Sequence, residues 1–307
     1  MEFKKIMMVV LIVSILLISS ISHINAKKNE IIIAEANWPG IRAKTAAAKI
    51  LLTKIGYPVS TKFVNDVVAH NGVAEDQIDI YMGSWMPTRK DTMEKIKDKV
   101  EIAATNTDNC LYIMGVPKYV WDQGVKTFAD LEKYKDKFDK KMYVGPSGWA
   151  ADKIMQKAID NNVYNLGDWE VVNSTQGATL AQVTKSIREK EWICFVAWKP
   201  HWMNYMFDIK YLKDPEKLWE DPISTVLTLV PKNFKSKWPE AHKLTKNLIF
   251  DIEVLNKWIY EIGKNNTDPE KTVLKWMKNN KKQVEKWLDG VKAKNGEDAY
   301  KVFLQNI

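Results

Sequence analysis

The sequence predicts an α/β fold whose strands are largely parallel and flanked by helices. Three observations carry this prediction. Short apolar runs typical of buried strands recur along the chain, helix-like segments follow them, and the runs end in turns that contain Gly, Pro and Trp. The chain has 307 residues, of which 46% are apolar and 27% charged, as in ordinary globular proteins. This length suits one large domain or two medium ones.

The first unit of strand, turn and helix lies near the start of the chain. A buried strand is expected over residues 31–34, and a turn follows it at residues 37–40. An alanine-rich helix then runs through residues 45–48 and ends at Gly56, because glycine is the residue that most often follows the end of a helix.

Three further strands are expected along the chain. The second covers residues 78–82 and ends in a turn at 83–87. The third covers residues 142–145, and a helix over 149–159 follows it after a short Pro-Ser-Gly turn. The fourth covers residues 192–197. No internal repeat or flexible linker separates these units, so two domains would be joined by strands or tight crossings.

The first residues have the features of a secretory signal. Lys4 and Lys5 precede an apolar run over residues 6–18, which is shorter than the roughly 20 residues of a membrane span. We expect a signal peptide over residues 1–26 with cleavage after Ala26, and therefore a periplasmic protein. An uncleaved anchor is the alternative.

Charge and cysteine content point to no special chemistry. The net charge is +8, but the lysines are interleaved with acids on helical segments, so we expect solvated helix faces and no nucleic-acid partner. Cys110 and Cys194 lie in apolar, strand-like runs, where they could form a disulfide in an oxidising compartment or remain two buried free thiols. With four His and two Cys, we expect no metal or cofactor.

Tryptophan is unusually frequent, with 13 residues, and four of them share one position relative to the predicted strands. Each lies at or just past the carboxyl end of a strand, which is the edge where open α/β sheets bind ligands. Core packing is the ordinary role of a single Trp, but four at equivalent positions indicate a site. This tryptophan box consists of Trp38, Trp85, Trp149 and Trp198.

The other tryptophans are interpreted as structural. Trp276 and Trp287 are eleven residues apart on a helical stretch, so they share a face and are expected in the core. Trp258 lies in an amphipathic run. Four more occur in surface-like contexts, namely Trp121, Trp169, Trp219 and Trp238.

A cluster of indole rings in a dry pocket has a well-defined chemical use. The faces of the rings are negative and attract a quaternary ammonium by cation–π interaction, at about 0.5–2 kcal/mol for each ring. Sugar stacking is the competing use of Trp, but sugar sites also need many Asp, Asn and Arg side chains, which are few in these turns. The box therefore predicts a methylated-amine ligand.

Four motifs surround the box, namely Asn-Trp at 37–38, Asp-Ile-Tyr-Met-Gly-Ser-Trp-Met-Pro-Thr at 79–88, Gly-Pro-Ser-Gly-Trp at 145–149 and Ala-Trp-Lys-Pro-His-Trp at 197–202. With these motifs the chain resembles the periplasmic substrate-binding proteins of glycine betaine, proline betaine and choline ABC transporters. The resemblance implies a two-lobed clamshell of the type II class, each lobe a mostly parallel sheet flanked by helices.

The same resemblance implies a domain organisation and a partner. Residues 27–113 and 225–307 would form lobe one, and residues 114–224 lobe two. Trp38 and Trp85 would then face Trp149 and Trp198 across the cleft, so that the box is complete only when the lobes close. A membrane permease would recognise the closed form of a monomeric receptor.

The identity of the ligand is left open between several methylated amines. Choline-type relatives carry an acid where this chain has Gly40, whereas Arg89 matches a position that holds the ligand carboxylate in betaine receptors. The N–H groups of Ala150 and Ala151 match the other carboxylate donors and begin a predicted helix, which suits an anion. Tyr112 would close one wall of the box. Glycine betaine is therefore expected, with choline, trimethylamine N-oxide or a sulfonium analogue as alternatives.

A secreted hydrolase or lyase is the competing class. The chain has no Gly-x-Ser-x-Gly motif, no P-loop and no metal-binding spacing of His. His201 lies between two tryptophans, but no nucleophile or acid pair accompanies it in the sequence. We therefore expect a binding protein and no catalytic residue.

Overall fold

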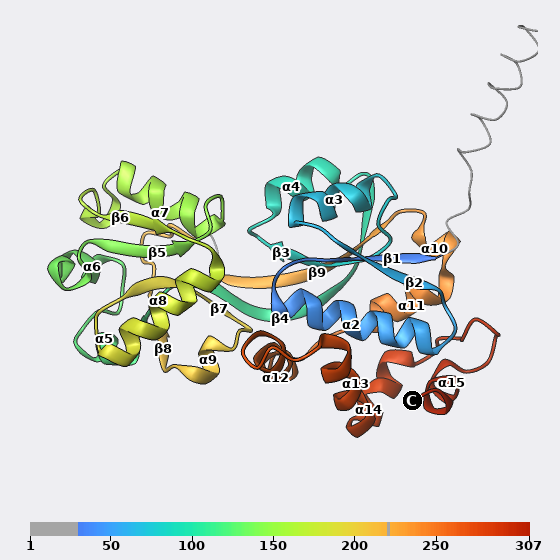
Figure 1. Ribbon diagram of the computed structural model, residues 1–307. Helices are drawn as coiled ribbons and strands as arrows, with labels where there is room; N and C mark the ends of the chain where they lie inside the picture. The colour runs from blue at the N-terminus through green and yellow to red at the C-terminus, as the bar shows by residue number, and fades with distance from the viewer. Residues whose placement is uncertain (1–29, 220–221) are drawn as a thin grey trace, which may run out of the picture.

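The computed structural model describes residues 30–219 and 222–307. The predicted signal peptide, residues 1–26, lies outside the described residues. The fold is α/β, with one group of elements at each end of the molecule and long strands running between the two groups (Figure 1). The predicted α/β class with two lobes is thereby confirmed.

The strands and helices alternate along most of the chain. The strands are β1 (Ile31–Glu35), β2 (Val59–Phe63), β3 (Tyr81–Met86), β4 (Val100–Pro117), β5 (Lys141–Gly145), β6 (Glu170–Asn173), β7 (Cys194–Lys199), β8 (Ile209–Tyr211) and β9 (Ile223–Pro231). The helices before the crossing of β4 are α2 (Pro39–Lys54), α3 (Asp66–Ala74) and α4 (Lys90–Ile96).

The remaining helices divide between the two ends of the molecule. Those between β4 and β9 are α5 (Lys118–Asp122), α6 (Ala129–Lys133), α7 (Ala150–Asp160), α8 (Gln176–Glu189) and α9 (Met203–Met206), with 3₁₀ turns at Lys135–Phe138 and Val163–Asn165. Those after β9 are α10 (Phe234–Lys237), α11 (Pro239–Asn247), α12 (Ile252–Gly263), α13 (Pro269–Asn279), α14 (Lys281–Leu288) and α15 (Ala299–Gln305).

The main sheet is mixed, with the order β3-β9-β4-β7-β5-β6 and β8 beside β4, while β1 and β2 form a separate parallel pair. The pairs β5/β6 and β5/β7 are parallel, as the strand–helix alternation predicts. The pairs of β4 with β7, β8 and β9 are antiparallel, and so is β3 with β9. The antiparallel pairing follows from the two strands β4 and β9, which cross between the ends of the molecule in opposite directions. The prediction of largely parallel strands is therefore correct only for β1 with β2 and for β5 with β6 and β7.

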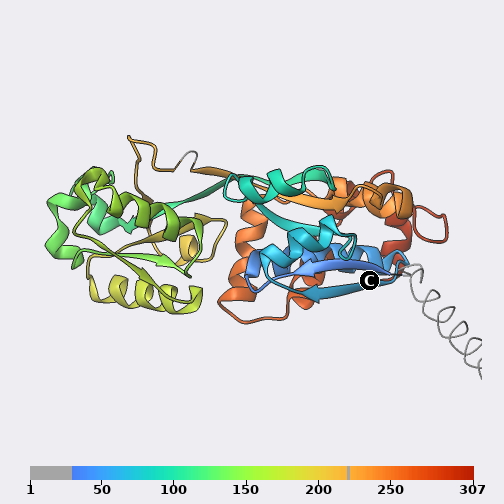
Figure 2. The ribbon, with the colours of Figure 1, turned by 90° about the horizontal axis from the view of Figure 1, so that it is seen from above.

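The strand β4 belongs to both ends of the molecule. Its first part pairs with β9 from Val100 to Leu111, and its last part pairs with β7 and β8 from Leu111 to Pro117. Seen from above, β4 and β9 span the gap between the two groups of elements (Figure 2). The predicted lobe boundaries at 113/114 and 224/225 fall within these two strands.

Side chains of β7 alternate between two hydrophobic clusters. Phe195 and Ala197 belong to the larger cluster, which also fills the end of the molecule that contains α2. Cys194 and Val196 belong to the smaller cluster around β5 and α7. Because successive side chains of a strand point to opposite faces, this sheet is covered by helices on both sides.

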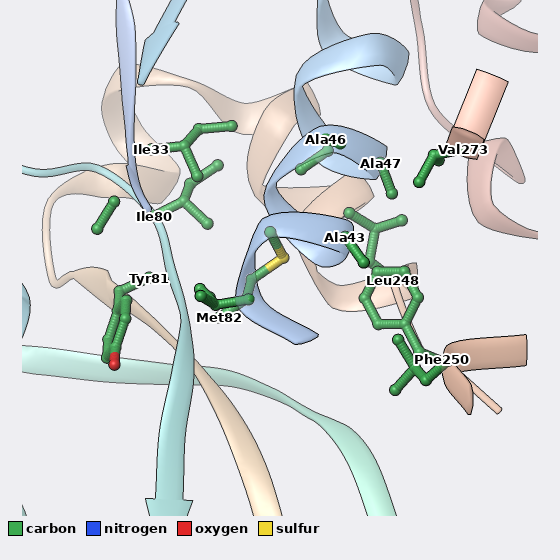
Figure 3. Close-up of a cluster of buried hydrophobic side chains, with 14 of the residues drawn as sticks. Ile33, Ala43, Ala46, Ala47, Ile80, Tyr81, Met82, Leu248, Phe250 and Val273 are labelled. Carbon is green, nitrogen blue, oxygen red and sulfur yellow. The ribbon is translucent and has the colours of Figure 1, made fainter. Parts of the chain in front are cut away.

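The larger cluster centres on helix α2. Its small side chains Ala43, Ala46 and Ala47 are almost fully buried. They lie between Ile80 next to β3 on one side and Val273 of α13 on the other (Figure 3). Alanine at these positions lets the sheet and the C-terminal helices approach the same helix from both sides.

The expected elements are found with shifted ends. The first helix ends at Lys54 with Gly56 just beyond it in the left-handed region, at φ +92. The second strand begins at Tyr81, and the expected turn at residues 83–87 is its continuation, since Trp85 and Met86 still pair with β9. Trp276 lies on α13 and Trp287 on α14, so the single helical stretch is broken near Asn280, although the two rings still pack 5.7 Å apart.

Two of the tryptophans that were expected at the surface are buried. Trp169 and Trp219 are each only 4% exposed and belong to the smaller cluster, so for these two the surface interpretation was wrong.

Cys110 and Cys194 are buried and free, and burial raises the pKa of both thiols. In the described part of the chain, no helix is long and apolar enough to cross a bilayer.

Lys44 is a buried lysine on α2, and it supports a prediction on pH dependence. Its Nζ donates hydrogen bonds to Asn106 Oδ1 at 2.7 Å and Thr107 Oγ1 at 3.1 Å on β4. Burial lowers the pKa of Lys44 to about 7, from an ordinary value of 10.5. Between these two values the unfolded chain binds more protons than the folded one, so stability rises with pH.

We expect the free energy of unfolding to increase from pH 7 to pH 8 by about 1 kcal/mol more in the native chain than in a Lys44→Met variant. Denaturant unfolding of both proteins at both pH values measures this difference. The comparison cancels the other titrating groups, which the two proteins share. Equal changes in the two proteins would contradict a depressed pKa of Lys44.

Candidate ligand-binding cleft

A cleft of about 1810 Å³ lies between the two groups of elements. One wall comes from the starts of α2, α3 and α4, and the other from the turn before α7, the end of β7 and the segment around Trp219. Sites for small molecules usually occupy about 300–1,000 Å³, so the walls stand further apart than a small amine requires. The predicted site residues that line the cleft are Trp38, Trp85, Arg89, Tyr112, Trp149, Ala150 and Trp198.

Aromatic rings of the second wall contact one another directly. The rings of Trp149 and Trp198 meet edge to face, with centroids 5.6 Å apart and planes at 77°. Tyr112 pairs with Trp198 in the ladder of β4 and β7, and their ring centroids are 6.5 Å apart. Trp219 extends this wall, since its ring lies 6.4 Å from that of Tyr112. Aromatic rings that line a cleft can bind a cation through their faces.

The first wall contributes the other two tryptophans of the box. Trp38 is the extended residue before α2, and Trp85 lies on β3, paired with Val226 of β9. Gly40 leaves the space in which the Trp38 ring lies, because a Cβ at residue 40 would come within 2.8 Å of that ring. An acidic side chain at this position would displace Trp38, so the missing acid and the position of the indole are linked.

Four predicted residues form the polar end of the cleft, namely Arg89, Tyr112, Ala150 and Ala151. Arg89 precedes α4, Ala150 begins α7, and the N–H of Ala151 donates to the Tyr112 hydroxyl at 3.3 Å. Burial raises the pKa of Tyr112, and the hydrogen bond from Ala151 and the nearby guanidinium of Arg89 oppose that rise. The hydroxyl therefore stays protonated. Its hydrogen remains available to an acceptor while its oxygen accepts from Ala151.

Ala151 differs from the other predicted site residues in its position. It is fully buried and does not line the cleft. Its N–H reaches the cleft only through the Tyr112 hydroxyl. In this conformation, the donors that face the cleft at the start of α7 therefore come from Ala150 and from the hydroxyl of Tyr112.

His201 packs behind the box. Its ring lies 4.6 Å from that of Trp198 and 5.1 Å from that of Trp202, and its Nδ1 accepts the N–H of Met203 at 3.3 Å. Burial lowers the pKa of His201 to about 3, so the imidazole is neutral. A neutral, buried ring that supports Trp198 has the features of a packing residue.

Two cleft residues are absent from the sequence-based prediction. Trp219 follows a charged segment with no strand signal before it. Asp66 begins α3 after the strand β2, whose exposed side chains give no clear strand pattern. Both line the cleft. The Asn65 cap signal just before Asp66, together with a strand at 59–63, would have placed that acid beside the end of β1, which leads to Trp38.

Among residues 30–219 and 222–307, no group of three or more His, Cys, Asp or Glu side chains is placed to hold a metal ion.

The chain belongs to the OpuAC family, described as the substrate binding domain of the ABC-type glycine betaine transport system, whose sequence model matches residues 29–279. A curated relative is the glycine betaine/carnitine transport binding protein GbuC of Listeria monocytogenes serotype 1/2a (strain 10403S). It is 32% identical over 145 residues. The match covers 47% of this chain and 47% of the relative, so it spans about half of that protein.

Solved structures match over nearly the whole fold. A choline-binding protein of an ABC transporter, in complex with choline, has a TM-score of 0.82 at 28% identity and covers 90% of this chain and 97% of its own. The glycine betaine/L-proline-binding protein ProX of Borrelia burgdorferi has a TM-score of 0.78 at 26% identity, and the match covers 89% of this chain and 99% of that protein. Lactococcal OpuAC, in its closed conformation with glycine betaine, has a TM-score of 0.76 at 26% identity. The match covers 85% of this chain and 99% of that protein.

Proposed function

We propose that this protein is the solute receptor of an ABC importer and binds glycine betaine or a related quaternary ammonium compound in the cleft. The observation that carries the proposal is the set of aromatic side chains on both walls, with Arg89, Tyr112 and the start of α7 at one end. Four indoles at about 0.5–2 kcal/mol each supply a large share of the roughly 8 kcal/mol that micromolar binding requires.

Closure of the cleft completes the site in this proposal. In it, residues 27–113 with 225–307 are one lobe and residues 114–224 the other. The strands β4 and β9, which contain both proposed boundaries, connect them. A ligand that touches both walls binds the closed form more strongly and so shifts the population toward it. The membrane permease then receives the ligand from the closed receptor, and a signal peptide over residues 1–26 directs the chain to the periplasm.

Glycine betaine is favoured over choline by the charges at the polar end. Arg89 and the hydroxyl of Tyr112 are donors, which suit a carboxylate. The ammonium group requires only the rings, so choline, trimethylamine N-oxide and sulfonium analogues fit the same box. Gly40 supplies no acid for the hydroxyl of choline.

Titration of the mature protein with these ligands tests the proposal. We expect a saturable change in tryptophan fluorescence, a rise in melting temperature, and full recovery of unchanged ligand by NMR after prolonged incubation. L-proline and an uncharged isostere of glycine betaine, with a tert-butyl group in place of trimethylammonium, serve as controls. Product that accumulates with time would instead support a hydrolase or lyase, and absence of binding to every methylated amine would overturn the proposal.

A further inference from the structure

The guanidinium of Arg89 is held by a chain of contacts that starts inside lobe one. Arg89 Nη2 donates to Asp66 Oδ2 at 2.6 Å, and the Tyr81 hydroxyl donates to Asp66 Oδ1 at 2.7 Å. The Arg89 and Asp66 side chains are 30% and 26% exposed, whereas Tyr81 is fully buried. The carboxylate of Asp66 therefore links a rigid core residue to a cation in the cleft wall.

The core end of this chain is fixed by several further contacts. His70 Nδ1 lies 2.6 Å from the carbonyl oxygen of Asp66, and His70 Nε2 lies 3.0 Å from Ser84 Oγ. A carbonyl only accepts, so Nδ1 carries the proton and Nε2 accepts from Ser84. Burial lowers the pKa of His70, which keeps the ring neutral.

Gly83 makes room for the Tyr81 hydroxyl. A Cβ at Gly83 would come within 2.7 Å of that oxygen, which also lies 3.1 Å from the carbonyl oxygen of Gly83. The strand β3 therefore places Trp85 in the box and, through Tyr81 and Gly83, also fixes the position of Asp66. The aromatic end and the polar end of the cleft are built on the same strand.

We propose that Asp66 is a positioning residue that sets the choice of ligand by orienting Arg89. This inference rests on the proposed function. Each oxygen of Asp66 already has a donor, whereas a guanidinium carries five N–H groups, of which the pair with Asp66 uses one. The pair therefore offers the cleft N–H donors in a fixed direction. It favours a ligand with an acceptor end, such as a carboxylate, over one whose polar end is a hydroxyl donor.

Two effects of Asp66 have opposite signs, and this makes the proposal testable. As a negative charge beside Arg89, Asp66 weakens the attraction of the cleft for an anion. As an anchor, it holds the guanidinium where the anion binds, which reduces the entropy lost on binding. The proposal is that the anchor effect is the larger.

The test compares Asp66→Asn with Asp91→Asn by calorimetry, with glycine betaine and tetramethylammonium as the two probes. Asp91 is an exposed acid in the first turn of α4 that borders the same cleft, so its variant removes an equal charge near Arg89. We expect Asp66→Asn to weaken glycine betaine binding about tenfold and to change tetramethylammonium binding by less than about twofold. Asp91→Asn should not weaken glycine betaine.

Tyr81→Phe gives a second, independent measurement. It removes the hydroxyl that fixes Asp66 and keeps both charges, so a weaker loss in the same direction is expected for glycine betaine alone. Binding of tetramethylammonium reports that each variant is folded. Unchanged or tighter binding of glycine betaine to Asp66→Asn would overturn the inference while the receptor function stands. Failure of the unmutated protein to bind either probe would overturn the proposed function itself.

Discussion

Replacement of Trp287 by alanine is expected to lower the free energy of unfolding by about 3–5 kcal/mol and to leave the ligand affinity of the folded protein unchanged. Trp287 is 2% exposed, and the centroid of its ring lies 5.5 Å from that of Phe250 and 6.4 Å from that of Trp258. Its Nε1 also donates to the carbonyl of Ile249 at 3.0 Å. The variant leaves a cavity among C-terminal helices far along the chain from the cleft residues.

Trp198→Ala is the matched counterpart and is expected to behave in the opposite way. It should weaken ligand binding by about 1–3 kcal/mol, since it removes a ring from the cleft wall, and should cost less stability because Trp198 is half-buried. Denaturant unfolding measures the loss of stability, and calorimetry measures the loss of ligand affinity. Equal losses of affinity in the two variants would contradict the division of the tryptophans into box and core.

This division could be predicted from the sequence because it depends on local signals. The strands β5 and β7 are short apolar runs that end in Gly or Trp-Lys-Pro, so the residues at or just past their ends fall at a known edge of the sheet. Trp149 and Trp198 follow from that rule alone. Ring contact between them adds the geometry that the rule leaves out.

The crossing strand β4 could not be predicted in the same way. Its middle contains Thr105, Asn106, Thr107 and Asp108, which resemble a loop, and its register with β9 shifts three times. Asn106 is buried there because Lys44 of α2, 62 residues away, donates to it. A polar strand whose side chains hydrogen-bond to a distant lysine has no local pattern, so tertiary contacts override propensity.

The polar end of the cleft shows the same limit. Arg89 was predicted from a motif, but its partner Asp66 lies 23 residues earlier and depends on β2, an exposed strand with little hydrophobic pattern. The hydrogen bond from Ala151 to Tyr112 joins β4 to α7 across 39 residues. Both contacts depend on how strands are arranged in the sheet, which composition and spacing do not encode.

Arg89→Ala should separate the candidate ligands. Glycine betaine loses a charge-assisted hydrogen bond and meets the unpaired carboxylate of Asp66, so its binding should weaken by about 1.5–3 kcal/mol, tenfold or more. Choline has no carboxylate, and its cation is attracted by the acid that Arg89 had neutralised. Its affinity should therefore stay constant or increase.

Calorimetry with both ligands on both proteins measures the four affinities. The unmutated protein should prefer glycine betaine by at least about tenfold, and the variant should lose most of that preference. Arg42→Ala is a suitable control, because Arg42 on α2 forms an ion pair with Glu35 at 3.2 Å and does not line the cleft. Tighter binding of choline to the unmutated protein would show that Arg89 does not hold a carboxylate, and the aromatic rings alone would then account for recognition.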